Sequence, residues 1–116
     1  MNYVENIALK SHRKRSGLTQ EDVAIIIGAQ SASQVSRHES GEREPDLGTA
    51  IAYRIVLDAP TAHLLPRLFR QIAEKVDERA AKLTSQLAME GGMHQDERLE
   101  LLSQLRARIR IYHLAV

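Results

Sequence analysis

The sequence has no cysteine and no tryptophan, and aromatic residues make up only 3% of its 116 residues. Without cysteine there can be no disulfide bonds and no thiolate metal sites, which fits a reducing cytoplasm. The hydrophobic residues, 43% of the chain, are mostly leucine, isoleucine, valine and alanine. A core of that composition favours packed helices over a β-sandwich, which is richer in β-branched and aromatic side chains.

Long apolar runs are also missing from the sequence. No stretch approaches the ~18 apolar residues that a membrane-spanning helix needs. The segment Met1–Leu9 is too polar for a signal peptide, because it contains Asn2, Glu5 and Asn6. We therefore expect a cytoplasmic protein that does not contact a membrane.

The usual signatures of an enzyme or a metal site are absent as well. None of the histidines lies four residues from another, and there is no H-E-x-x-H motif (His12, His38, His63, His94 and His113). There is also no glycine-rich phosphate loop and no nucleophile elbow. The sequence therefore predicts no metal, no cofactor and no catalytic residues.

Helix signals dominate the chain, and no segment reads convincingly as a strand. Seven helices are expected, the first from about Tyr3 to Ser16 and the third from about Ala32 to Ser40 with Ser31 as its N-cap. Glycines mark the ends of the first three helices, since glycine adopts the left-handed C-terminal conformation without strain (Gly17, Gly28 and Gly41). Thr19 and Asp22 predict a capping box at the start of the second helix.

The segment Leu9–Pro45 carries a recognisable motif. It contains an arginine near the end of the first helix, a Gly-Leu-Thr-Gln entry to the second helix, and an alanine and a glycine around the turn. A Ser-Arg pair follows in the third helix, which ends in Glu-x-Gly, and a proline closes the loop. These residues are Arg13, Gly17, Leu18, Thr19, Gln20, Ala24, Gly28, Ser36, Arg37, Glu39, Gly41 and Pro45. The motif resembles the lambda-repressor-like helix-turn-helix family, the XRE type that includes Cro and phage repressors.

The resemblance implies an all-α fold. A five-helix DNA-binding domain would occupy residues 1–65, and a C-terminal two-helix extension would occupy residues 66–116. It also implies that Arg13 and Glu39 form an ion pair and that the third helix enters the major groove of double-stranded DNA.

Residue chemistry assigns roles around that third helix. Its exposed face offers base-reading candidates, of which arginine is the strongest because it can bond guanine O6 and N7 together (Ala32, Ser33, Ser36 and Arg37). Gln20 stands at the N-terminus of the second helix, where backbone N–H groups attract a phosphate. Other polar or basic side chains are expected to contact the DNA backbone (Lys14, Arg15, Gln34 and Arg43).

Two features depart from the family pattern. The turn from Gly28 to Ser31 is one residue longer than usual, which leaves the start of the recognition helix open. His38 stands where the family usually has an aliphatic residue. It is either a core histidine satisfied by a hydrogen bond or a sign that the third helix packs differently.

After Pro66 the pattern changes to two long amphipathic helices separated by Gly91-Gly92, which suggests an antiparallel hairpin. A two-helix hairpin has little core of its own, so we expect it to form a dimer. The expected dimerisation residues lie along its apolar seam (Phe69, Ile72, Val76, Leu83, Leu87, Leu99, Leu102, Leu105 and Ile109).

These expectations favour a sequence-specific, nucleoid-associated transcriptional regulator. It would act as a homodimeric repressor of a mobile element, a phage or a small operon, on a palindromic operator. One alternative is the antitoxin of a toxin–antitoxin pair, which would repress its own operon and bind a toxin. Another is a protein-interaction adaptor without DNA binding, since basic and acidic residues are equal in number up to Pro45.

Overall fold

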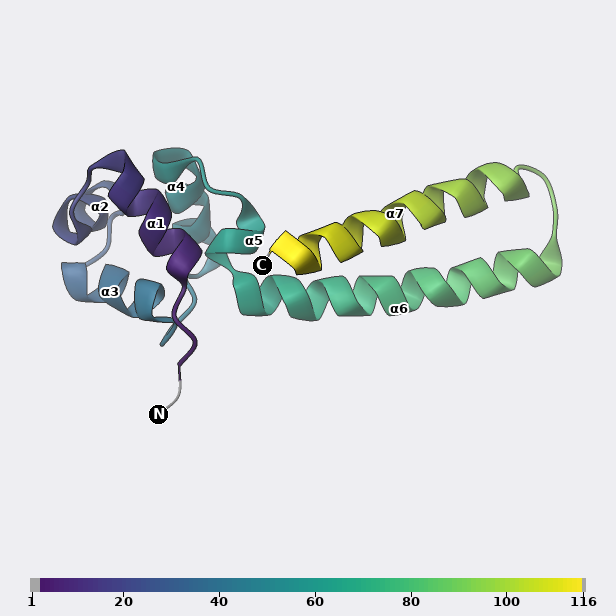
Figure 1. Cartoon of the computed structure of the whole chain (residues 1–116), viewed down its shortest axis with the longest axis horizontal. Helices are drawn as coiled ribbons and strands as arrows, with labels where there is room; N and C mark the ends of the chain where they lie inside the picture. The colour runs from purple at the N-terminus through teal and green to yellow at the C-terminus, as the bar shows by residue number, and fades with distance from the viewer. Residues whose placement is uncertain (1–2, 116) are drawn as a thin grey trace. The chain divides into compact units, whose positions relative to one another are not determined.

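A computed structural model describes residues 3–115, and the side chains of residues 3–112. The chain divides into two units, Met1–Arg67 and Leu68–Val116. Within the described residues the secondary structure is entirely helical, as expected (Figure 1). The helices are α1 (Ile7–Ser16), α2 (Gln20–Ile27), α3 (Ala32–Ser40), α4 (Leu47–Leu57), α5 (Thr61–Leu64), α6 (Pro66–Glu90) and α7 (Gln95–Ala115).

The helix ends follow local chemistry. Gly17, Gly28 and Gly41 take left-handed backbone conformations at the ends of α1, α2 and α3. At the start of α2, the Thr19 hydroxyl accepts from the Asp22 N–H, and the Asp22 carboxylate accepts from the Thr19 N–H, both at 3.0 Å. These contacts form the predicted capping box, which satisfies two N–H groups that would otherwise lack a partner.

The predicted start of the first helix was wrong by one turn. The helix begins at Ile7, because the side chain of Asn6 caps it by accepting a hydrogen bond from the Leu9 N–H at 3.0 Å. Residues 3–5 have no regular secondary structure. A capping asparagine competes with helix formation in the residues that precede it.

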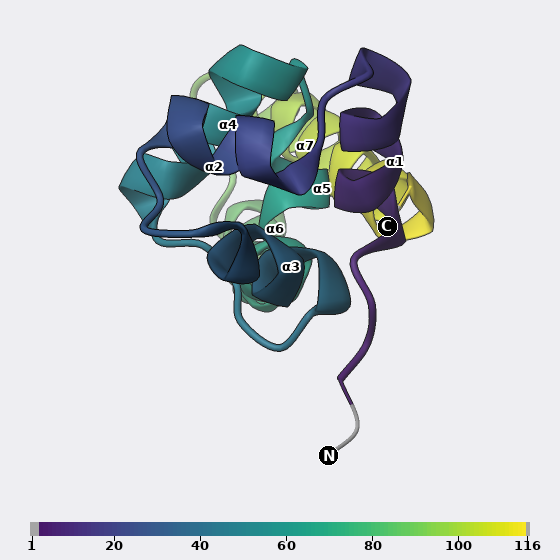
Figure 2. The same cartoon turned by 90° about the vertical axis from the view of Figure 1, so that its left-hand side faces the viewer.

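The first unit is built around one hydrophobic core. Tyr53 of α4 is its largest fully buried side chain, and Leu9, Val23, Val35 and Leu64 come from the other four helices. Full burial of a side chain such as valine or leucine contributes about 1.5–3 kcal/mol relative to exposure. In Figure 2, α2 lies between α3 and α4, so it braces both helices.

The second unit is a hairpin in which α6 and α7 pack together. Its core contains Ala80, Leu87 and Leu102. An ion pair between Arg106 and Asp77, 2.8 Å apart, adds a polar link between the two helices. Within the described residues no helix is both long and apolar enough to cross a membrane.

Candidate nucleic-acid interface

Helix α3 has one buried edge and one exposed edge. Val35, His38 and Glu39 are buried, with Val35 fully inaccessible. The side chains of Ser33, Ser36, Arg37 and Ser40 are exposed, while Ala32 and Gln34 are half-buried. The helical repeat places the four exposed residues on one edge. Three of the four base-reading candidates are therefore exposed to solvent, and the fourth, Ala32, is half-buried.

The backbone conformation of the turn before α3 shows where this helix begins. Gly28 takes a φ of 78°, and the Ala29 N–H donates to the Ala24 carbonyl at 2.8 Å. Ser31 is extended and occupies the N-cap position, but its side chain makes no capping hydrogen bond. Helix α3, the candidate recognition helix, therefore starts at Ala32, directly after the turn from Gly28 to Ser31.

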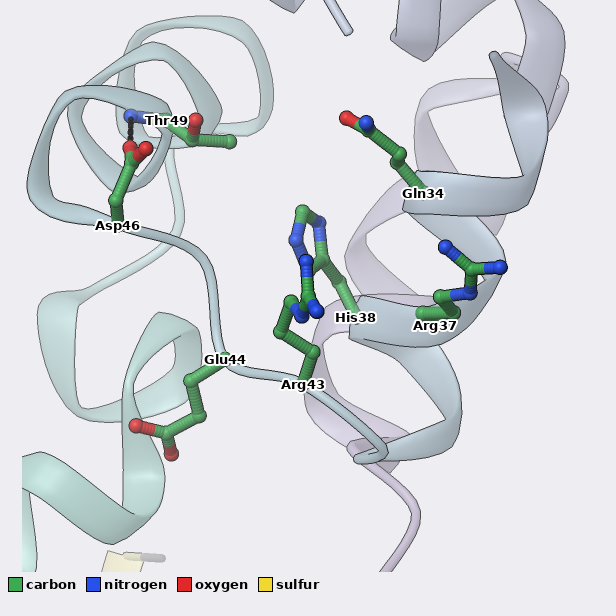
Figure 3. A pocket seen from close by; sticks show the side chains of 7 residues that line it. All are labelled: Gln34, Arg37, His38, Arg43, Glu44, Asp46 and Thr49. Atoms are coloured by element: carbon green, nitrogen blue, oxygen red, sulfur yellow. Dashed lines mark hydrogen bonds between the residues drawn. The ribbon is translucent and has the colours of Figure 1, made fainter. Parts of the chain in front are cut away.

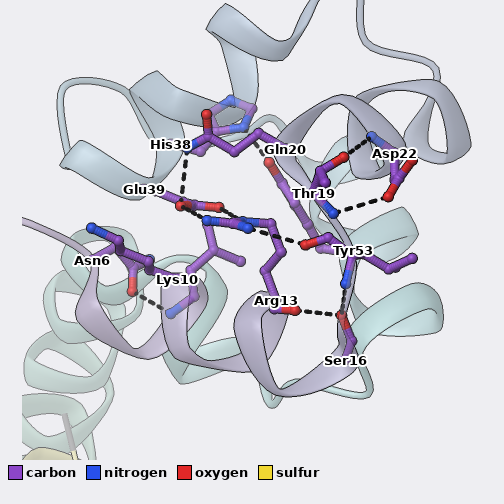
Figure 4. A network of polar contacts seen from close by, with 12 residues as sticks. Asn6, Lys10, Arg13, Ser16, Thr19, Gln20, Asp22, His38, Glu39 and Tyr53 are labelled. Carbon is purple, nitrogen blue, oxygen red and sulfur yellow. Dashed lines mark hydrogen bonds and ion pairs between the residues drawn. The ribbon is translucent and has the colours of Figure 1, made fainter.

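An ion pair ties α3 to α1. The Arg13 guanidinium meets the Glu39 carboxylate through two hydrogen bonds, Nε to Oε2 at 2.5 Å and Nη2 to Oε1 at 3.0 Å (Figure 4). Arg13 also donates to the Leu18 carbonyl at 3.0 Å. The hydrogen bond to Glu39 raises the pKa of Arg13. A charged, bidentate pair of this kind fixes the direction of both side chains.

Gln20 joins the same network. Its Nε2 donates to the Glu39 Oε1 at 3.2 Å, and its side chain is half-buried. The amide carries a second N–H, which this bond leaves unused. Gln20 is thus held at the N-terminus of α2 by the same carboxylate that anchors α3 (Figure 4).

His38 is a core histidine with a hydrogen-bond partner, so the first of the two interpretations holds. Its Nδ1 lies 2.8 Å from the Tyr53 hydroxyl in the buried interior. Burial lowers the pKa of His38, and the nearby Arg43 guanidinium lowers it further. Burial also raises the pKa of Tyr53. Both groups are therefore neutral near pH 7, which suits a buried hydrogen bond.

A polar pocket of about 340 Å³ opens beside α3. It is framed by α3, the loop after it and the first turn of α4 (Figure 3). Asp46 caps α4 by accepting from the Thr49 N–H at 2.8 Å. The lining side chains include two arginines and two carboxylates (Gln34, Arg37, His38, Arg43, Glu44, Asp46 and Thr49).

The remaining basic candidates lie at the surface. Lys14 and Arg15 are exposed in the last turn of α1. Arg37 lies 3.9 Å from Glu42, and both side chains are about half exposed. Arg43 forms no ion pair among the described residues. These side chains are available to anionic partners.

A contact at the end of α3 carried no clear sequence signal. The backbone N–H of Asn6 donates to the Glu39 carbonyl at 2.8 Å, so the segment from Val4 to Asn6 passes the end of α3. The Val4 carbonyl occupies the space that a Cβ on Gly41 would need. Gly41 is therefore needed both for the left-handed end of α3 and for the close approach of the Val4 carbonyl. The glycine in the sequence predicted the helix end but not the approach.

The expected dimerisation residues divide into two groups. Most of them are covered by other residues of the hairpin. Leu87 and Leu102 are core residues, and Leu99 and Leu105 pack against that core. Ile109 is buried, and Phe69 packs edge-on against Tyr112. Val76 is half-buried. Only Ile72 and Leu83 remain substantially open, with 53% and 38% exposed.

Among the side chains of residues 3–112 no cluster of three or more histidine or acidic groups is arranged to hold a metal ion. One histidine pair does meet between α1 and α5, where the His12 Nε2 lies 3.1 Å from the His63 Nδ1. Burial lowers the pKa of His12, and Arg15 and His63 act in the same direction. The pair therefore joins α1 to α5 through a side-chain contact.

Comparison with known protein families gives a match over the region that contains this site. A family described as helix-turn-helix matches residues 9–64. Comparisons with curated proteins and with solved structures found no match. The family consists of DNA-binding regulators and is generally non-enzymatic. Residues 9–64 are thus a helix-turn-helix domain of the lambda-repressor-like, XRE type.

Proposed function

We propose that the chain is a homodimeric repressor that binds a palindromic operator in double-stranded DNA and occludes the promoter of a mobile element, a phage or a small operon. The observation that carries this proposal is the division of α3 into two edges. Val35, His38 and Glu39 anchor one edge, while Ser33 and Arg37 lie exposed on the other.

Base reading would depend mainly on Arg37. Its contact with Glu42 is long and solvent-exposed, so it contributes little and is easily exchanged. In the major groove the guanidinium would bond guanine O6 and N7 together. Ser33 and Ser36 would bond base edges or phosphates, and the Ala32 methyl group would touch a thymine methyl.

Backbone contacts would fix the register of the domain on the duplex. The N-terminus of α2 presents N–H groups to a phosphate, and Gln20 is already oriented there by its bond to Glu39. Lys14, Arg15, Gln34 and Arg43 would add phosphate contacts around α3. Such contacts supply affinity without sequence information.

Dimerisation would double the contact with DNA. Family domains bind half-sites about one helical turn apart. The hairpin would join two copies through Ile72 and Leu83, the two seam residues that it leaves open.

Fluorescence anisotropy tests the proposal by measuring how the protein binds DNA from the region upstream of its own gene. The titration is repeated at several salt concentrations. Wild type should bind one site with an affinity that falls steeply with salt. Arg37→Ala should lose about 1–3 kcal/mol of discrimination at one base pair. Arg70→Ala, on an exposed position of α6, is the matched control. Absence of binding at low salt would overturn the proposal and favour a protein-interaction adaptor.

A further inference from the structure

The His38 ring has one nitrogen that the fold supplies with a partner and one that it leaves open. Nδ1 lies 2.8 Å from the Tyr53 hydroxyl. Among residues 3–112 every fully buried side-chain nitrogen or oxygen has a hydrogen-bond partner, and the structure gives none to Nε2 of His38. Nε2 is therefore not fully buried. Because His38 is only 7% exposed and lines the polar pocket beside α3, Nε2 reaches solvent through that pocket (Figure 3).

The bond to Tyr53 lets Nε2 act as a hydrogen-bond donor in both charge states of the ring. Burial raises the pKa of Tyr53, so its hydroxyl keeps its proton and can donate to Nδ1. In the neutral ring Nε2 then carries the proton. In the charged ring both nitrogens donate, and the Tyr53 hydroxyl turns to accept from Nδ1. The buried bond thus persists while the ring gains a proton.

The other groups in the pocket favour an anion next to Nε2. Arg43 forms no ion pair among the described residues. Its guanidinium lowers the pKa of His38, an effect second to that of burial, and Asp46 acts in the opposite direction. The two carboxylates already accept hydrogen bonds: Asp46 caps α4, and Glu44 accepts from the backbone N–H of Arg67 at 2.6 Å. The charge of Arg43 therefore has no such partner, whereas those of the acids do.

The pocket borders the edge of α3 that is proposed to face DNA. Arg37 belongs to both the pocket and that edge. A duplex that takes α3 into its major groove passes its sugar–phosphate backbone along the flank of the helix. The volume of about 340 Å³ is small for a ligand pocket but ample for one phosphate group and its waters.

We propose that His38 is a further DNA-contacting residue, whose Nε2 donates to one backbone phosphate that the pocket holds together with Arg43. This inference rests on the proposed function and deepens it, because it gives a buried histidine of α3 a role in binding. A phosphate at this place offsets the charge of Arg43 and accepts from Nε2, so it favours the protonated ring.

Proton uptake on binding is the measurable consequence. Since DNA favours the protonated ring, the complex binds a proton at a higher pH than the free protein does, and by linkage the affinity for DNA rises as the pH falls between those two values. The titratable or charged groups that face His38 come from α3, the loop after it and α4 (Arg37, Arg43, Glu44, Asp46 and Tyr53).

DNA titrations at constant ionic strength, between about pH 8 and 5.5, test the inference. With DNA from the region upstream of the gene, the affinity of wild type should rise at least about threefold, which is half a pKa unit of coupling. His38→Gln keeps a neutral amide but cannot titrate, so it should bind without this rise. His12→Gln, which removes another histidine of the first unit, is the matched control and should retain it. An equal rise in wild type and His38→Gln would overturn the inference.

NMR of the imidazole signals supplies a second measurement that needs no variant. The titration of His38 in wild type is followed alone, with sulfate and with the same DNA. Sulfate is a tetrahedral oxyanion whose charge is constant over this range. DNA should move the midpoint of His38 upward by at least about half a unit, while the signals of His94, exposed in the second unit, should not respond.

The sulfate sample separates two sources of the anion. A shift with sulfate as well as DNA would mean that the pocket takes a free oxyanion too, and a shift with DNA alone would mean that the phosphate enters only as part of a duplex. Both results support the inference. Binding of DNA without any shift of His38 would overturn it and leave the proposed function intact. Absence of DNA binding at low salt would instead show that the proposed function itself is wrong.

Discussion

The Arg13 guanidinium and the Glu39 carboxylate, 26 positions apart in the chain, meet as a two-bond ion pair between α1 and α3. The side chain of Glu39 is only 4% exposed and that of Arg13 only 11%. The pair therefore connects the first helix to the helix proposed to read DNA. Its burial makes the loss of either partner costly, because the remaining charge would be stranded away from water.

Replacing Arg13 with methionine should destabilise the protein strongly. We expect Arg13→Met to lower the free energy of unfolding by about 3–5 kcal/mol, since it leaves Glu39 buried without its cation. Urea denaturation measures this change. Lys10→Met is the matched control on the same helix, because the Lys10–Glu5 pair is exposed at 41% and 49%. It should cost no more than about 1 kcal/mol, and comparable losses in both variants would contradict the expectation.

Stability should fall in mild acid through His38. Its pKa is lowered from the ordinary 6.5, chiefly by burial. The unfolded chain therefore takes up a proton at a higher pH than the folded one. The resulting stability is present in full above the unfolded pKa and is lost as the pH falls through the folded pKa.

The measurement is urea denaturation between about pH 7.5 and 5, a range above the titration of ordinary carboxyl groups. His38→Gln should flatten the slope of stability against pH in that range. His12, whose pKa is also lowered chiefly by burial, should account for the slope that remains. An unchanged slope in the His38→Gln, His12→Gln double variant would show that other groups dominate.

Gly41 should be less replaceable than Gly17, although both have a φ near 80°. A Cβ at Gly17 meets nothing, whereas one at Gly41 collides with the Val4 carbonyl. We expect Gly17→Ala to cost about 1–2 kcal/mol for the left-handed backbone. Gly41→Ala should cost measurably more by thermal or urea unfolding, and equal losses would mean that the N-terminal segment moves aside freely.

Arg43 should contribute affinity without specificity. Arg43→Ala is expected to weaken binding about equally for matched and mismatched operators and to reduce the slope of log affinity against log salt by about 1. Titrations at several salt concentrations measure both quantities. Arg98→Ala, at an exposed position of α7, should leave the slope unchanged. A change in base preference with Arg43→Ala would instead assign this residue to base reading.

Local chemistry made much of the fold predictable. Glycines that end helices, the Thr19–Asp22 capping box and the apolar periodicity act over a few residues, so they are legible in sequence. The family motif then predicted that the second and third helices form a helix-turn-helix. The first helix was misplaced because the capping effect of Asn6 was overlooked, although it is itself a local signal.

Contacts between residues far apart in the chain were harder to predict from the sequence. Pairing of Arg13 with Glu39 came only from the family resemblance, since no local rule joins residues so far apart. The partner of His38 could not be named at all, because Tyr53 meets it only once α3 and α4 have both packed into the core. Likewise, periodicity marked the hairpin seam as apolar without telling which of its residues the hairpin itself would bury.

By itself, then, the sequence determined the helical elements, their order and the motif of the family, because caps, turns and periodicity depend on neighbouring residues. Tertiary packing alone decided which side chains are left for partners. It buried one edge of α3 and left Arg37 exposed. It packed most of the apolar seam within the hairpin, and it left Leu47, Ile51 and Ile55 of α4 exposed. Exposure depends on every other element of the fold, so no local pattern can fix it.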